Sequence, residues 1–123
     1  MNKAQAIDKF WNSFELQAYD ENSVPDKTPF PYISYGVVTD SFDAPVNLYG
    51  SIWYRDTSWA DISRKSDEIA RKLYEGKPYL IKLDTGYLWI AQGQPFARRM
   101  GDPSDDLIKR IYINLQAEFL TAI

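Results

Sequence analysis

The tripeptide Asp84-Thr85-Gly86 is the segment of this chain whose residue types could most directly do chemistry. In aspartic proteases the same tripeptide contains the catalytic aspartate, and two such carboxyl groups share one proton. Here the next residue is Tyr87, where those enzymes carry Ser or Ala, and little chain remains for the body of a protease. We therefore interpret the tripeptide as a turn between two strands, because Asp and Gly suit turn geometry.

A second candidate site lies shortly before the final apolar segment. Asp102, Ser104 and Asp106 have the one-three-five spacing that opens a calcium-binding loop. Such a loop needs Gly and Glu at the positions that Leu107 and Ile113 occupy here. The pattern predicts a turn leading into a strand, and we expect no metal site.

The absence of two residue types excludes most catalytic machinery. The chain has no His and no Cys, which removes Ser–His–Asp triads, thiolate nucleophiles and His- or Cys-ligated metals. The 17 Asp and Glu residues leave catalysis by paired carboxylates as an alternative, although no spacing singles out two of them. We expect a protein that is not an enzyme and that needs no cofactor.

The charge pattern argues against nucleic acid and membrane partners. The net charge is −3, and the adjacent Arg98 and Arg99 belong to no basic stripe, so we predict no nucleic-acid sequence recognition. Charged residues from Lys3 to Lys9 stand where a signal peptide needs an apolar run, and no apolar stretch could span a bilayer. We expect a protein that remains in, or assembles in, a reducing cytoplasm.

The length of 123 residues fits a single domain, residues 1–123. Apolar periodicity and the positions of Pro and Gly predict seven elements and two long irregular segments. In chain order these are a helix over 3–18, a loop over 19–31, strands over 32–40 and 46–55, a helix over 59–75, hairpin strands over 79–83 and 87–91, an irregular segment over 92–106, and a strand over 107–121. The order α-β-β-α-β-β-β predicts an α+β fold, with an antiparallel sheet and helices packed on one face.

Several local signals support these bounds. Ser58 is the predicted N-cap of the second helix, with Asp61 completing a capping box. Gly76 and Gly86 are predicted to take left-handed conformations, after that helix and in the hairpin loop. The final strand is longer than usual, so we expect it to bend or to extend beyond its neighbours.

Three aromatic residues, Tyr49, Trp53 and Tyr112, fall on strand faces that otherwise carry polar residues. Aromatic and Arg side chains on such a face are typical of protein–protein contact. A second layer of helices covering these rings is the alternative, and the pattern alone leaves both open.

Several segments carry a resemblance that covers roughly residues 7–122. They are Phe10-Trp11-Asn12-Ser13-Phe14, Phe30-Pro31-Tyr32-Ile33, Ser51-Ile52-Trp53-Tyr54-Arg55, Thr57-Ser58-Trp59-Ala60, Pro95-Phe96-Ala97-Arg98-Arg99-Met100, Asp102-Pro103-Ser104-Asp105-Asp106 and Ile111-Tyr112-Ile113-Asn114. In these segments the chain resembles a small family of bacteriophage proteins from Gram-positive hosts. Those proteins are similar to tail terminators or head–tail joining proteins, sometimes labelled minor capsid or tail component proteins. The predicted element order is also similar to the tail-terminator fold.

The resemblance implies a structural role in the neck of the virion. Six copies would form a ring that caps the tail tube, with the tail tube protein and the head-completion or connector protein as partners. The loops 19–31 and 92–106 are the expected contact segments, because a ring subunit needs two complementary surfaces. The candidate interface residues are Tyr19, Phe30, Phe96, Arg98, Arg99 and Tyr112. We expect Phe96, Arg98 and Arg99 to meet acidic residues of the neighbouring copy.

Three alternatives remain beside the tail terminator. The first is another neck component, such as a head-completion or stopper protein. The second is a small hydrolase that uses carboxylates. The third is a host-directed phage accessory protein that binds one partner.

Overall fold

The computed structural model describes residues 1–39 and 42–121. These residues form two α-helices, one 3₁₀ turn and six strands. The elements are α1 (Lys3–Trp11), η1 (Asn12–Phe14), β1 (Ala18–Asp20), β2 (Tyr32–Tyr35), β3 (Pro45–Arg55), α2 (Ala60–Glu75), β4 (Tyr79–Lys82), β5 (Gly86–Asp102) and β6 (Asp105–Thr121). The predicted α+β class is confirmed.

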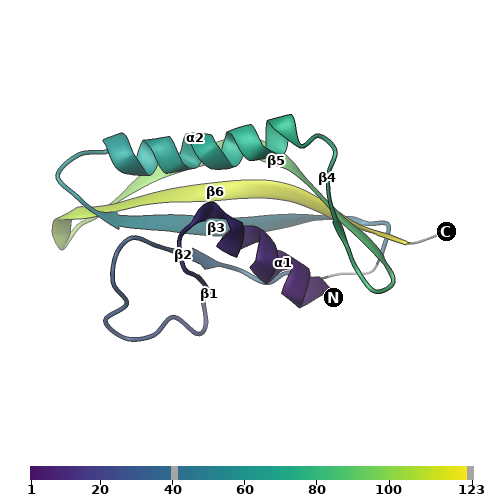
Figure 1. The fold of residues 1–123 in the computed structure, drawn as a ribbon. Coiled ribbons are helices and arrows are strands. Elements are labelled where there is room, and N and C mark those ends of the chain that lie inside the picture. Colours follow the sequence, from purple (N-terminus) through teal and green to yellow (C-terminus); the bar gives the residue numbers. More distant parts are fainter. Residues whose placement is uncertain (40–41, 122–123) are drawn as a thin grey trace.

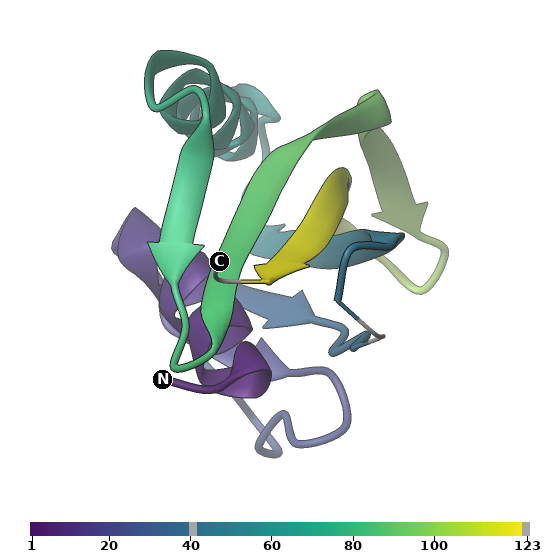
Figure 2. The same ribbon diagram turned by 90° about the vertical axis from the view of Figure 1, so that its right-hand side faces the viewer.

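The described strands form one mixed sheet in the order β1-β2-β3-β6-β5-β4. β1 runs parallel to β2, and the other neighbouring strands are antiparallel. The prediction of a wholly antiparallel sheet and of the order α-β-β-α-β-β-β was therefore wrong. Figures 1 and 2 show that the sheet is strongly curled, with α1 and α2 lying inside the curl.

The first helix ends earlier than predicted: η1 and a bend follow α1, and only the predicted last residue, Ala18, belongs to a strand, β1. The side chain of Asn12 donates to the main-chain oxygen of Asp8 and accepts from the main-chain nitrogen of Ala18, at 3.0 Å each. Glu15 takes a left-handed conformation with φ 64°, which turns the chain away from the helix. The main-chain nitrogen of Glu21 donates a hydrogen bond to the main-chain oxygen of Tyr35 at 2.8 Å. The first residues of the predicted loop 19–31 are therefore paired with β2 and form part of a strand.

The predicted irregular segment 92–106 is largely strand, which is the main error of the sequence analysis. β5 continues through it and pairs with β6, apart from a register shift between Gln92 and Ala97. Gly93 lies within this bulge, where an added Cβ would stand only 2.7 Å from the main-chain oxygen of Asn114. Gly and Pro therefore mark a bulge inside a strand here, and not a loop.

The other bounds are closer to prediction. β3, α2, the β4–β5 hairpin and β6 begin and end within about two residues of their predicted positions, apart from the longer β5. The predicted strand over 32–40 ends at Tyr35, and the predicted strand end Asp40 and turn residue Ser41 lie outside the described residues.

The predicted caps of α2 were wrong. Trp59 is the N-cap residue, while the Ser58 hydroxyl accepts from the main-chain nitrogen of Ala60 at 3.0 Å. Asp61 forms an ion pair with Arg64 instead of completing a capping box. No glycine of the described segments has a positive φ, so the left-handed conformations predicted for Gly76 and Gly86 are not adopted.

One hydrophobic core fills the space between the helices and the inner face of the sheet. The central strands contribute every second residue to it, and these side chains are almost fully buried. The inner-face residues are Leu48 and Ile52 of β3, Leu88 and Ile90 of β5, and Ile111, Ile113, Leu115, Ala117 and Phe119 of β6. The helices meet these residues with Ile7, Phe10 and Trp11 of α1 and Ile62, Ile69 and Leu73 of α2.

Trp11 is the largest of the fully buried side chains. A Cβ added to Gly50 would stand 2.7 Å from its ring, so the indole lies directly on the backbone of β3. Its ring nitrogen Nε1 is buried without a hydrogen-bond partner among the described residues, which is an unusual cost in a core.

Candidate interaction surface

The outer face of the sheet, opposite the helices, carries aligned aromatic and arginine side chains. Tyr32 of β2 pairs in register with Trp53 of β3, and Trp53 pairs with Arg110 of β6. Arg110 in turn pairs with Met100 of β5. One row of large side chains therefore crosses four strands, because partners in register project to the same side of a sheet.

Stacking and hydrogen bonds hold this row together. The rings of Tyr32 and Trp53 stack with centroids 6.1 Å apart and planes 13° apart. The guanidinium carbon of Arg110 lies 4.8 Å from the centroid of the Trp53 ring, a cation–π contact. Trp53 Nε1 donates to the Ser34 hydroxyl at 2.8 Å, and Arg110 Nε donates to the Ser51 hydroxyl at 2.9 Å.

A second set of side chains lies further along β3 and β6. Tyr49 and Tyr112 stack with centroids 5.9 Å apart, and the Tyr49 hydroxyl donates to Glu21 at 2.6 Å. This hydrogen bond, together with burial, raises the pKa of Tyr49. Arg98 of β5 is the register partner of Tyr112, and both border a hollow of about 230 Å³ beside Pro95.

We name these outer-face side chains the outer band. Its members are all at least partly exposed and come from β2, β3, β5 and β6. The outer band consists of Tyr32, Tyr49, Trp53, Arg98, Arg110 and Tyr112. The sequence left open whether helices cover Tyr49, Trp53 and Tyr112, and in the described structure these rings are partly exposed while both helices lie on the other face (Figure 2).

The structure brings some of the predicted interface residues to this face. Arg98 and Tyr112 are part of the outer band, and Tyr19 and Phe30 flank it through ring contacts with Tyr32 at 6.2 and 5.5 Å. Tyr19 lies in β1, and Phe30 lies in the loop between β1 and β2 that projects from the edge of the sheet in Figure 1.

The other two predicted interface residues, Phe96 and Arg99, lie elsewhere. The guanidinium carbon of Arg99 lies 5.1 Å from the centroid of the Trp59 ring. Its Nη2 donates to the hydroxyl of Ser63, a residue of α2, at 3.2 Å. Phe96 packs against the hydrophobic core and is only partly exposed. Adjacent residues of a strand point to opposite faces, which is why Arg98 and Arg99 separate.

Sequence reasoning left Tyr32 and Arg110 out of the candidate interface. Both could have been found from the period-two alternation, which places Arg110 on the same face as Tyr112. Their contact with Trp53 depends on the register of three strands, and no single strand pattern contains that information.

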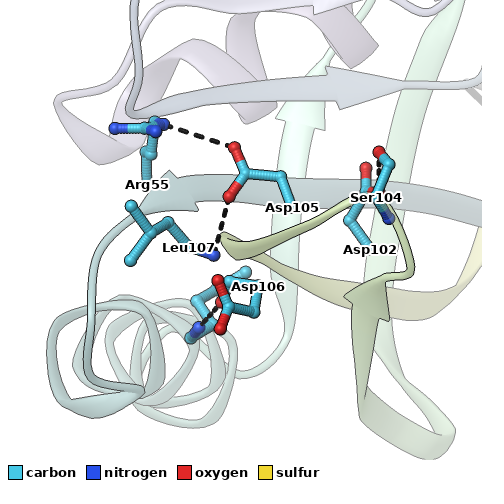
Figure 3. Close-up of polar contacts among 7 residues, drawn as sticks. Arg55, Asp102, Ser104, Asp105, Asp106 and Leu107 are labelled. Atoms are coloured by element: carbon cyan, nitrogen blue, oxygen red, sulfur yellow. Dashed lines mark hydrogen bonds and ion pairs between the residues drawn. The ribbon is translucent and has the colours of Figure 1, made fainter.

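The two motifs that suggested catalysis or metal binding are turns, as predicted. Asp84 lies in the turn between β4 and β5 and binds the Met1 ammonium group. Asp102 accepts hydrogen bonds from the main chain and hydroxyl of Ser104 at 2.8 and 2.7 Å, which lower its pKa (Figure 3). Within the residues that the structure describes, no three acidic side chains come together as a metal site would require.

In comparisons with known proteins, no family model and no curated protein matches the chain. In the described part of the chain, neither helix is long and apolar enough to cross a membrane. The outer band is the feature with the most specific chemistry, and it favours binding to a protein surface.

Proposed function

We propose that this protein is a structural assembly protein of a bacteriophage, a tail terminator that forms a ring on the end of the tail tube. The resemblance of its sequence segments to phage neck proteins supports this role. The outer band is the observation that carries the proposal, since it presents Trp, Tyr and Arg side chains of four strands on one face of the sheet.

The outer band has the composition of an energetically important protein interface. Trp, Tyr and Arg are the residues most enriched at such positions. Its side chains are already held by stacking and by hydrogen bonds to Ser34, Ser51 and Glu21. Docking therefore immobilises few additional rotamers, which lowers the entropic cost of association.

A tail terminator places two demands on its subunit. Each copy must contact its neighbours in the ring and must also seat on the tube. The outer band suits the second contact because it is a broad face, while the edges and ends of the sheet remain for the first. Contacts between unlike surfaces of neighbouring copies close into a ring when the rotation allows.

Electron microscopy of tail tubes from the same phage tests the proposal. We expect the full chain to form a cap confined to one end of each tube and to stop further growth. The variant Tyr112→Ala should lose the cap, whereas Tyr74→Ala, a change at a 75% exposed tyrosine of α2 outside the outer band, should keep it. Tubes that remain uncapped by the wild-type protein would overturn the tail-terminator role.

The same experiment separates the neck alternatives. A head-completion or stopper protein would bind isolated head connectors and leave tube ends free. Adding connectors to the grids therefore distinguishes the two roles, because a terminator should decorate the tube before any connector is present.

A further inference from the structure

A groove of about 350 Å³ lies between α1, α2 and β4 and carries mostly positive charge. Three lysines from these three elements line it, Lys9, Lys72 and Lys82, together with the polar side chains of Ser13 and Tyr79. This concentration of cations contrasts with the net charge of −3 of the whole chain. The groove is therefore a local basic surface on an acidic protein.

No carboxylate of the described residues neutralises these lysines. Lys72 Nζ donates to the Ser13 hydroxyl at 2.8 Å and lies 4.9 Å from the Phe14 ring, so it is held in place without an ion pair. Within the described segments, neither Lys9 nor Lys82 forms an ion pair. Asp84, which follows β4, already binds the Met1 ammonium group.

The turn between β5 and β6 carries the opposite charge. Figure 3 shows three carboxylates there, on Asp102, Asp105 and Asp106. Asp105 has an ion-pair partner, Arg55, at 3.6 Å, and both side chains are partly exposed. Lys109 Nζ lies nearby but donates to the main-chain oxygen of Asp106, which leaves that exposed carboxylate without an ion pair in the described structure.

The acidic turn and the basic groove face different directions. In Figure 1 the β5–β6 turn is at one end of the molecule, and the N-terminus and the β4–β5 turn are at the other. A single copy therefore cannot join its own two surfaces. Two copies can join them head to tail, and a contact between unlike surfaces repeats from copy to copy until it closes.

From this charge complementarity we propose that the acidic β5–β6 turn of one copy docks into the lysine groove of the next copy. The inference rests on the proposed ring assembly and names the contact between its subunits. Leu80, which is 47% exposed beside the groove, and Pro103 in the turn supply apolar area to the same contact.

The charges set register and encounter rate more than affinity. Exposed ion pairs contribute little stability each, because water and salt screen them. Complementary charges do accelerate association and disfavour wrong pairings. The contact should therefore be weak between free subunits, sensitive to salt and strengthened once a tail tube holds the copies side by side.

Zero-length carbodiimide cross-linking of the full chain tests this contact, since it joins only amines and carboxylates in direct contact. A 1:1 mixture of ¹⁴N- and ¹⁵N-labelled protein at about 1 mM distinguishes links between copies from links within one copy. We expect mixed-isotope links from Lys9, Lys72 or Lys82 to Asp102, Asp105 or Asp106, and we expect added salt at about 0.5 M to abolish them. Absence of these links at low salt would overturn the proposal.

Charge reversal gives an independent test. Lys82→Glu and Asp106→Lys change exposed side chains, so both variants should fold, and each alone should lose the links about tenfold. Mixing the two variants should restore an intermolecular link between the groove and the turn, whereas Lys77→Glu, a change at an exposed lysine outside the groove, should keep the wild-type links. Single reversals that leave the links unchanged would mean that charge complementarity does not direct this contact, and the proposal fails.

The two proposals fail in different ways. If the links form but tubes stay uncapped, the subunit contact stands and the tail-terminator role falls. If Lys82→Glu caps tubes as well as the wild type does, the role stands and this contact is wrong.

Discussion

The inner and outer faces of the sheet are built from the same strands but stabilised in different ways. On β6, Ile113 is fully buried among apolar side chains, while the preceding Tyr112 is partly exposed and stacks on Tyr49. The inner face gains its stability from apolar area removed from water. The outer face relies on stacking and hydrogen bonds between side chains that remain accessible, so it can stabilise the fold modestly and still bind a partner.

The largest effect should follow from a change on the inner face. Ile113→Ala deletes buried methyl groups and leaves a cavity, so we expect the free energy of unfolding to fall by about 2–5 kcal/mol. Urea denaturation followed by tryptophan fluorescence measures this change. A loss as small as that of Tyr112→Ala would show that the two faces do not differ as described.

Two glycines compare the faces more closely, Gly50 within β3 and Gly36 directly after the end of β2. A Cβ at Gly50 would lie 2.7 Å from the Trp11 ring, and a Cβ at Gly36 would lie 2.2 Å from the Tyr49 ring. Trp11 is fully buried and cannot move, whereas Tyr49 is partly exposed and can rotate outward. We therefore expect Gly50→Ala to lower the free energy of unfolding by about 1–3 kcal/mol. Gly36→Ala should lower it less, although the added Cβ would lie closer to its neighbour at Gly36 than at Gly50.

Thermal unfolding of the two glycine variants under the same conditions checks this order. Equal losses would contradict it. An outward movement of Tyr49 in Gly36→Ala should also break the hydrogen bond to Glu21, which a crystal structure of the variant would reveal.

At alkaline pH, one tyrosine of each face should affect the free energy of unfolding to a different extent. Burial and a 2.5 Å hydrogen bond to Asp8 raise the pKa of Tyr35 well above its ordinary value of about 10. Above that pH the unfolded chain releases this proton while the folded chain keeps it, so stability falls as the pH rises. Tyr35→Phe should reduce this slope by up to about 1.4 kcal/mol per pH unit.

Tyr49→Phe is the matched change on the outer face. Its pKa is also raised, chiefly by Glu21, but the side chain is more exposed, so we expect a smaller change of slope. Urea denaturation at pH 9, 10 and 11 gives both slopes. A larger effect from Tyr49→Phe would reverse the comparison.

The smallest effect on stability should come from Tyr112→Ala, the outer-band variant that we expect to lose the tube cap. It removes one stacked pair from a partly exposed face, which is worth about 0.5–1.5 kcal/mol. Thermal unfolding and tube capping measured on the same preparation therefore separate folding from binding. A variant that caps tubes normally would remove the outer band from the proposed tube contact.

The sequence predicted those parts of the fold whose signal lies within one element. Alternation along β3 and β6 assigned their residues to two faces, and the stripe on residues 60–75 predicted α2. These patterns report which side of an element meets the core, and they need no knowledge of its neighbours.

Tertiary structure decided the rest, because it depends on pairing between distant segments. Pairing with β6 lets β5 continue past Gly93 and Pro95, although these two residues by themselves indicate a loop. Pairing with β2 likewise makes a strand of Ala18–Asp20. The outer band likewise needs four strands in register, and the lysine groove needs three elements far apart in the chain. Hydrogen bonds and contacts between such segments outweigh local propensity, and a linear pattern does not contain them.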